Sequence, residues 1–124
     1  MLFRSIGSIQ NQQYYKQVKD KIKELDLSEN IELTDYVSPD KLSSMIADYH
    51  IHISTSNCET FGRSIFETLA SGMPNITRLR NNAAYDFLKN LPYIKFTLDN
   101  NEALYALLMK YCWIFLNYHQ WQLK

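Results

Sequence analysis

The sequence predicts an α/β fold, a doubly wound parallel sheet with helices on both faces. Short apolar runs alternate with amphipathic stretches along the chain, as expected for parallel strands that are joined by helices. The chain has 124 residues, a length typical of one domain, and its 46% hydrophobic content is sufficient to fill a core. We therefore expect five strands in one sheet.

In the first half of the chain, an apolar run at Leu2–Ile6 predicts a buried strand. A helix is predicted at Asn11–Leu25, because its apolar residues recur at helical spacing and its lysines lie opposite them. A second strand is expected at Asn30–Leu33. Ser38 and Pro39 then predict the start of a second helix, with the serine as N-cap and the proline at the first helical position.

The second half predicts three further strands and three further helices. The strands are expected at Ile51–Ser54, Pro74–Arg78 and Tyr93–Thr97, and the helices at 62–72, 82–89 and 101 to about 118. The 62–72 helix is the best bounded, since Gly62 can begin it and Ile65, Phe66, Leu69 and Ala70 recur at helical spacing. Gly72 can end it in a left-handed conformation, and Pro74 follows where a helix cannot continue.

Two carboxylates bracket the start of this helix. Glu59 lies in the preceding loop, and Glu67 lies eight positions later, inside the first two helical turns. Unpaired backbone N–H groups at a helix start suit an anion such as a phosphate. The segment therefore offers acceptors for sugar and ribose hydroxyls beside donors for a diphosphate, which are the two requirements of a nucleotide sugar. Taken alone, two such glutamates are more often solvated residues that suit the helix dipole.

The surrounding residues strengthen the functional interpretation. The run Glu59-Thr60-Phe61-Gly62, four residues, then Glu67-Thr68-Leu69-Ala70-Ser71-Gly72-Met73-Pro74 resembles the E-x7-E signature of retaining glycosyltransferases with the GT-B fold, the group 1 glycosyl transferases. That family's pattern is close to E-T-F-G, four variable residues, and E-A-M-A-S-G-L-P. The resemblance covers about Leu2 to Ile76, and it implies a Rossmann-like, C-terminal, donor-binding domain that forms one half of the enzyme.

The resemblance also implies the roles of individual residues. Glu59 is the catalytic candidate and faces the donor sugar, with Phe61 and Gly62 beside it. Arg63, Ser64 and Ile65 approach the diphosphate, and Glu67 accepts hydrogen bonds from the ribose. The implied reaction moves a hexose from a nucleotide sugar to a glycan or lipid-linked acceptor with retention, in cell-surface polysaccharide or glycolipid synthesis. The resemblance implies no metal, and it implies no cofactor because the nucleotide sugar is a substrate.

Parts of the family's pattern are not found in this sequence. The first strand and helix of the donor domain, which carry a basic pair for the diphosphate, have no counterpart, and neither does the acceptor domain that comes first in the family. We therefore expect residues 1–124 to be a partial C-terminal domain that is inactive when isolated. Asp35 stands where the family usually has glycine, so we expect the turn there to differ.

The composition excludes several other classes. The formal net charge is zero, which argues against a protein that binds nucleic acid through its phosphates. No apolar run is long enough to span a bilayer and no signal peptide opens the chain, so we expect a cytoplasmic protein. Two cysteines are too few for a disulfide framework. His50 and His52 alternate along one strand, and without a third ligand they are better explained as structural or surface residues than as a metal site.

Two rival functions remain open at this stage. One is a non-catalytic Rossmann-like module that binds a nucleotide and regulates a partner. The other, a doubly wound signalling protein, would need an acidic cluster that Asn57-Cys58-Glu59 does not supply. The aromatic C-terminal stretch, with Trp113 and Trp121 off its best apolar face, favours contact with the missing domain over peripheral contact with the inner face of the cell membrane.

Overall fold

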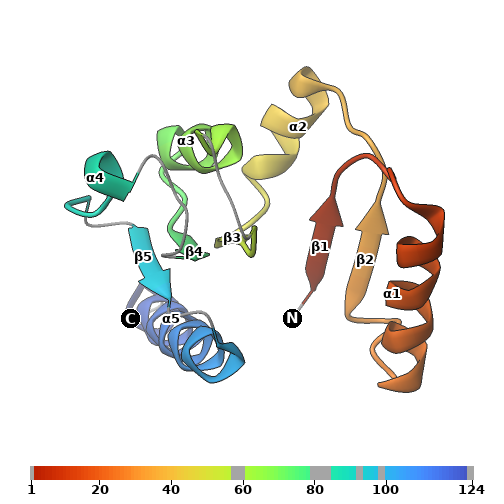
Figure 1. The fold of residues 1–124 in the computed structure, drawn as a ribbon. Coiled ribbons are helices and arrows are strands. Elements are labelled where there is room, and N and C mark those ends of the chain that lie inside the picture. The colour runs from red at the N-terminus through yellow and green to blue at the C-terminus, as the bar shows by residue number, and fades with distance from the viewer. Residues whose placement is uncertain (1, 57–60, 79–84, 92–93, 98–99, 123–124) are drawn as a thin grey trace. The chain divides into compact units, whose positions relative to one another are not determined.

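The structure, a computed structural model, describes residues 2–56, 61–78, 85–91, 94–97 and 100–122. Its elements alternate between strand and helix, as the sequence predicts (Figure 1). The contacts divide the chain into two units, Met1–Met45 and Ile46–Lys124, and each is described by itself below.

The first unit is built on a strand–helix–strand motif. Strand β1 (Phe3–Ile6) pairs in parallel with β2 (Ile31–Thr34), and helix α1 (Gln12–Glu24) connects them. The side-chain oxygen of Asn11 caps α1 by accepting a hydrogen bond from the Tyr14 amide at 2.9 Å. Helix α2 (Pro39–Ile46) begins at the predicted proline. These elements confirm the expected positions to within one or two residues.

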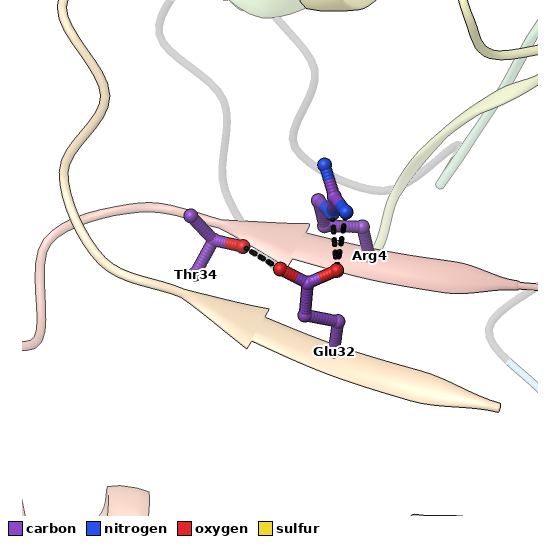
Figure 2. Close-up of polar contacts among 3 residues, drawn as sticks. All are labelled: Arg4, Glu32 and Thr34. Carbon is purple, nitrogen blue, oxygen red and sulfur yellow. Dashed lines mark hydrogen bonds and ion pairs between the residues drawn. The ribbon is translucent and has the colours of Figure 1, made fainter. Parts of the chain in front are cut away.

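The prediction that the first strand is buried is wrong. Phe3 is 42% exposed, and Arg4 lies opposite Glu32 in the strand register. Figure 2 shows the Arg4 guanidinium donating from Nε and Nη2 to one carboxylate oxygen of Glu32, the Nε bond being 2.7 Å long. The other carboxylate oxygen accepts from the Thr34 hydroxyl at 3.3 Å. Solvent therefore reaches this strand pair on the face that carries Phe3 and on the face that carries the ion pair.

The turn after β2 is organised by Asp35. Its Oδ1 accepts hydrogen bonds from the Ile9 amide at 3.2 Å and from the Tyr36 amide at 2.7 Å. A carboxylate at this position therefore joins the loop after β1 to the loop after β2. Glycine, which the family usually has here, could not make these bonds, so the departure from the family's pattern has a local structural role.

The second unit contains a three-stranded parallel sheet in the order β3-β4-β5. Its strands are β3 (His52–Ser54), β4 (Asn75–Arg78) and β5 (Ile94–Thr97). Helices α3 (Arg63–Ala70), α4 (Tyr85–Leu88) and α5 (Asn101–Gln122) follow the successive strands. Helix α3 contacts β3 and β4, and α5 contacts β5; Figure 1 draws these two helices on opposite sides of the three strands.

The described core of the second unit includes residues of α3, β4 and α4. Ile65 on α3, Ile76 on β4 and Leu88 on α4 are fully buried, and Phe66 and Leu69 pack against the cluster of Ile65 and Leu88. The predicted apolar positions of the 62–72 helix are therefore confirmed except for Ala70, which is exposed. On α5, Leu104, Leu107, Leu108 and Tyr111 recur at helical spacing and are all partly buried.

The strands pair differently from the single sheet that we expected. Among the described residues they form a two-stranded and a three-stranded sheet, and every pairing is parallel. Hydrophobic periodicity predicts where a strand lies, but pairing depends on contacts between distant segments, and β3 has only three residues with which to hold a neighbour.

Candidate functional site

The predicted site begins where the chain leaves the carboxyl end of β3 and enters α3. Strand β3 ends at Ser54 and α3 begins at Arg63. Ligands of parallel α/β sheets bind at this end of the strands. Of the residues predicted for the site, Phe61 to Ile65 and Glu67 are described, whereas Glu59, the predicted catalytic residue, lies outside the described residues.

Gly62 sets the direction in which the chain enters α3. Its backbone is left-handed, with φ at 70°, and it occupies the N-cap position. A Cβ added here would lie 2.9 Å from Cδ1 of Ile65, which is fully buried. The left-handed conformation therefore favours glycine at the entrance of the helix, and an added Cβ would force the end of the Ile65 side chain to shift. The prediction that Gly62 begins the helix is confirmed.

The other end of α3 closes as the sequence predicts. Gly72 is left-handed, with φ at 80°. Its amide donates to the Leu69 carbonyl at 2.9 Å, and the Met73 amide donates to the Thr68 carbonyl at 3.0 Å. This pair of bonds is the Schellman motif, in which a glycine terminates a helix by satisfying its last carbonyls. Gly62 and Gly72, both from the segment that resembles the E-x7-E signature, thus fix the two ends of α3.

The amides at the start of α3 are partly occupied. The Gly62 carbonyl accepts hydrogen bonds from the Ile65 amide at 2.9 Å and from the Phe66 amide at 3.3 Å. The Ile65 amide, predicted to approach a diphosphate, is therefore already used inside the helix. Arg63 and Ser64 precede it at the first two helical positions and are exposed. An anion at this terminus would thus meet these two residues first.

The aromatic residues at the helix entrance stack on each other. The ring centroids of Phe61 and Phe66 are 4.8 Å apart, with 18° between the ring planes. Phe61 is still 60% exposed, so one face of its ring is available to solvent or to a ligand. The stack holds the Phe61 side chain against α3, and this places its backbone at the helix entrance.

Glu67 projects from α3 one turn after Arg63. The two side chains form an i,i+4 ion pair, with 4.0 Å between Arg63 Nη2 and Glu67 Oε1. Glu67 is about half exposed, and it could therefore accept hydrogen bonds from a ligand without leaving the helix surface.

Sequence reasoning missed a polar cluster behind this surface. Asn75 at the start of β4 is fully buried and contacts both His52 on β3 and Thr68 on α3. The contact confirms a structural role for His52, while His50 lies before β3 begins. The sequence did contain a signal that could have indicated this cluster: His52 and Asn75 are polar residues within otherwise apolar strands. Asn75 is also the first residue of an apparent glycosylation sequon, Asn75-Ile76-Thr77. Because Asn75 is fully buried, this sequon is not accessible on the folded surface.

The described residues contain no cluster of three histidine, cysteine, aspartate or glutamate side chains arranged to hold a metal ion. Within the same part of the chain, no helix combines the length and apolar character needed to cross a bilayer.

Comparison with known proteins gives one family. The sequence profile of the family described as glycosyl transferases group 1 matches residues 3–115. Searches of curated proteins and of solved structures found no match. The profile spans nearly the whole chain, including both units and α3 with its flanking loop. This protein belongs to the glycosyl transferases group 1 family.

Proposed function

We propose that this chain is the donor-binding, C-terminal domain of a retaining GT-B glycosyltransferase of the E-x7-E type. One observation carries the proposal: α3 follows the carboxyl end of β3 in the chain, contacts that strand, and presents Arg63, Ser64 and Glu67 to solvent. Membership of the group 1 glycosyl transferases supports glycosyl transfer as the reaction class. The parallel α/β architecture supports a nucleotide-binding fold.

The donor would lie across the start of α3. Its diphosphate would meet the amides and side chains of Arg63 and Ser64, because the Ile65 amide is bonded to Gly62. The ribose hydroxyls would donate to the Glu67 carboxylate, and the sugar would lie near Glu59, Phe61 and Gly62. A ribose bound to Glu67 would compete with its ion pair to Arg63, which at 4.0 Å is long and readily broken.

The proposed chemistry is chiefly electrostatic. When the glycosidic bond to the nucleoside diphosphate breaks, negative charge accumulates on the departing phosphates. The positive end of the α3 dipole and the Arg63 guanidinium would stabilise that charge. Glu59 would interact with the donor sugar. The acceptor would be a glycan or a lipid-linked sugar, and the product a cell-surface polysaccharide or glycolipid made in the cytoplasm or at the inner face of the membrane.

We propose further that chain outside these 124 residues completes the enzyme. Among the described strands, β1 pairs only with β2, and β3 pairs only with β4. In the doubly wound order 3-2-1-4-5-6 the first strand of the domain lies between its second and fourth strands. The two observed sheets match the 3-2 and 4-5-6 parts of that order. The acceptor domain of the family would supply the other half of the catalytic cleft.

A thermal-shift screen tests the proposal. The chain would be heated with UDP-, GDP- and ADP-linked hexoses and with the corresponding nucleoside diphosphates. One nucleotide class should stabilise it, by about 2.7 kcal/mol at a ligand concentration one hundredfold above Kd. If none of these ligands shifts the melting temperature, donor binding by this chain is refuted.

A second assay separates an enzyme from a nucleotide-binding regulatory module. With a radiolabelled donor, the isolated chain should transfer no sugar, whereas a protein that also carries an acceptor domain should do so. Donor binding without transfer in the longer protein would favour the regulatory module. Turnover by the 124-residue chain alone would overturn the proposal that it is incomplete.

A further inference from the structure

One buried amide connects three elements of the second unit. Asn75 is fully buried at the first position of β4. Its Oδ1 lies 2.5 Å from His52 Nδ1 on β3 and 3.0 Å from Thr68 Oγ1 on α3. Its Nδ2 donates to the Met73 carbonyl at 2.8 Å. The bonds to Thr68 and Met73 are buried, and the contact with His52 is partly buried.

The partners determine which groups carry protons. The Met73 carbonyl can only accept, so the amide nitrogen of Asn75 must face it and Oδ1 must face His52 and Thr68. Both of these residues must therefore donate, which places a proton on Nδ1 of His52.

The Thr68 hydroxyl has one proton and three acceptors within reach. Besides Asn75 Oδ1, the carbonyls of Ser64 and Ile65 lie at 2.8 and 3.1 Å. Those two carbonyls already accept helical amide bonds from the residues four positions later, as α-helix geometry requires. Neither carbonyl is left without a partner when the Thr68 proton points to Asn75 Oδ1, and this is the arrangement that we assign.

Two members of this cluster, His52 and Thr68, flank the proposed donor loop, residues 55–62, in the sequence. His52 is two residues before the end of β3, and Thr68 is five residues after the start of α3. The intervening residues 55–62 contain Glu59 and Gly62. Because a buried polar group that loses its partner is costly, this cluster resists any shift of α3 against β3. It thus restrains both elements from which the loop extends.

We propose that Asn75 and Thr68 are positioning residues that set the start of α3 against the end of β3 and thereby tune diphosphate affinity. The proposal rests on the proposed function, because it assumes that the diphosphate binds at this helix start. Neither side chain would touch the donor, since Asn75 is fully buried and Thr68 is 6% exposed.

The first test requires no ligand and no variant. Long-range proton–nitrogen NMR of the 124-residue chain reports which imidazole nitrogen of each histidine is protonated. His52 should carry a proton on Nδ1. A neutral His52 protonated only on Nε2 would contradict the hydrogen bonds that we assign to Asn75.

The second test uses three variants of buried threonines. Thr68→Val removes the hydroxyl at nearly constant shape, and Thr68→Ser retains the hydroxyl. Thr77→Val is the matched control, because Thr77 is 1% exposed on the same strand as Asn75 and is outside the cluster. The amides of His52, Ile65 and Phe66 are hydrogen-bonded at the start of β3 and of α3. Their hydrogen exchange should accelerate about tenfold in Thr68→Val, stay near wild type in Thr68→Ser, and change little in Thr77→Val. Equal exchange in the two valine variants would overturn the positioning role.

The same variants are then titrated with UDP, GDP and ADP by calorimetry. For whichever diphosphate binds the wild type, Kd should rise about three- to tenfold in Thr68→Val beyond any rise in Thr77→Val, and Thr68→Ser should restore it. Unchanged affinity in Thr68→Val would overturn the tuning of the site while leaving donor binding intact. If none of the three binds the wild type, the proposed function and the tuning of affinity both fail, and the exchange data still decide whether the cluster positions α3.

Discussion

Arg63 and Glu67 lie one turn apart on the solvent-facing side of α3, with 4.0 Å between Arg63 Nη2 and Glu67 Oε1. Their side chains are 87% and 49% exposed, and exposed helical pairs contribute only about 0.3–0.5 kcal/mol to stability. The pair therefore contributes little to the stability of α3. It does place the groups proposed for the diphosphate and the ribose next to each other.

Replacing Glu67 should weaken donor use. In Glu67→Ala the ribose hydroxyls lose a charged acceptor, whose hydrogen bonds contribute about 1.5–3 kcal/mol. We expect donor affinity or kcat/KM of the complete enzyme to fall about ten- to hundredfold. Glu67→Gln keeps an acceptor oxygen without the charge and should lie between wild type and alanine, as measured by calorimetry and steady-state kinetics.

The control for Glu67 is Glu24→Ala. Glu24 is also an exposed helical glutamate in an ion pair, in this case with Lys21 at 2.8 Å, but it lies on α1 in the other unit. Its replacement should leave donor use unchanged. If the two alanine variants behave alike, Glu67 is only a helix surface residue and the ribose assignment is wrong.

The glycines should differ in their sensitivity to substitution. Gly62→Ala should be the most destabilising, because it combines a positive φ with a contact of 2.9 Å to Ile65. Gly72→Ala should cost about 1–2 kcal/mol, since its φ is positive but its surroundings are open. Gly7→Ala has neither problem and should change the free energy of unfolding by less than about 0.5 kcal/mol in urea denaturation. A reversed order would contradict the described path of the chain at α3.

Two neighbouring residues test the core of the second unit. Leu88 is fully buried against Ile65, whereas Phe87 beside it is 81% exposed. Leu88→Ala should lower the free energy of unfolding by about 2–5 kcal/mol, because it leaves a cavity. Phe87→Ala should have a small effect despite its larger loss of side chain. Equal effects in denaturant unfolding would show that α4 does not pack as described.

Alkaline stability should depend on Tyr111. Burial raises the pKa of the Tyr111 hydroxyl above its ordinary value of 10.0. The unfolded state then loses this proton first, so the contribution of Tyr111 is fully present below pH 10 and declines as the pH rises from there through the folded-state pKa. In urea unfolding between pH 8 and pH 11, Tyr111→Phe should lose stability less steeply than wild type. Identical slopes would indicate that Tyr111 is solvated.

The local elements were predictable because their signals are local. Ser38-Pro39 predicted where α2 begins, and Gly62 and Gly72 predicted the ends of α3, since φ and hydrogen-bonding limits belong to individual residues. The spacing of Ile65, Phe66 and Leu69 predicted which side of α3 packs inward. The same motif residues predicted the family, which the profile match to residues 3–115 confirms. The roles of Glu59 and Glu67 remain predictions.

Only the tertiary structure decided what depends on distant segments. No periodicity in the sequence indicates that β1 pairs with β2 while β3 pairs with β4, or that Arg4 faces Glu32 across 28 positions of chain. Nor does it indicate that Asn75 lies between His52 and Thr68, because a buried amide is satisfied by whichever groups the packed chain brings to it. A strand or a cap is specified within a few residues, whereas strand order and a buried polar cluster are specified by the free energy of the assembled interior.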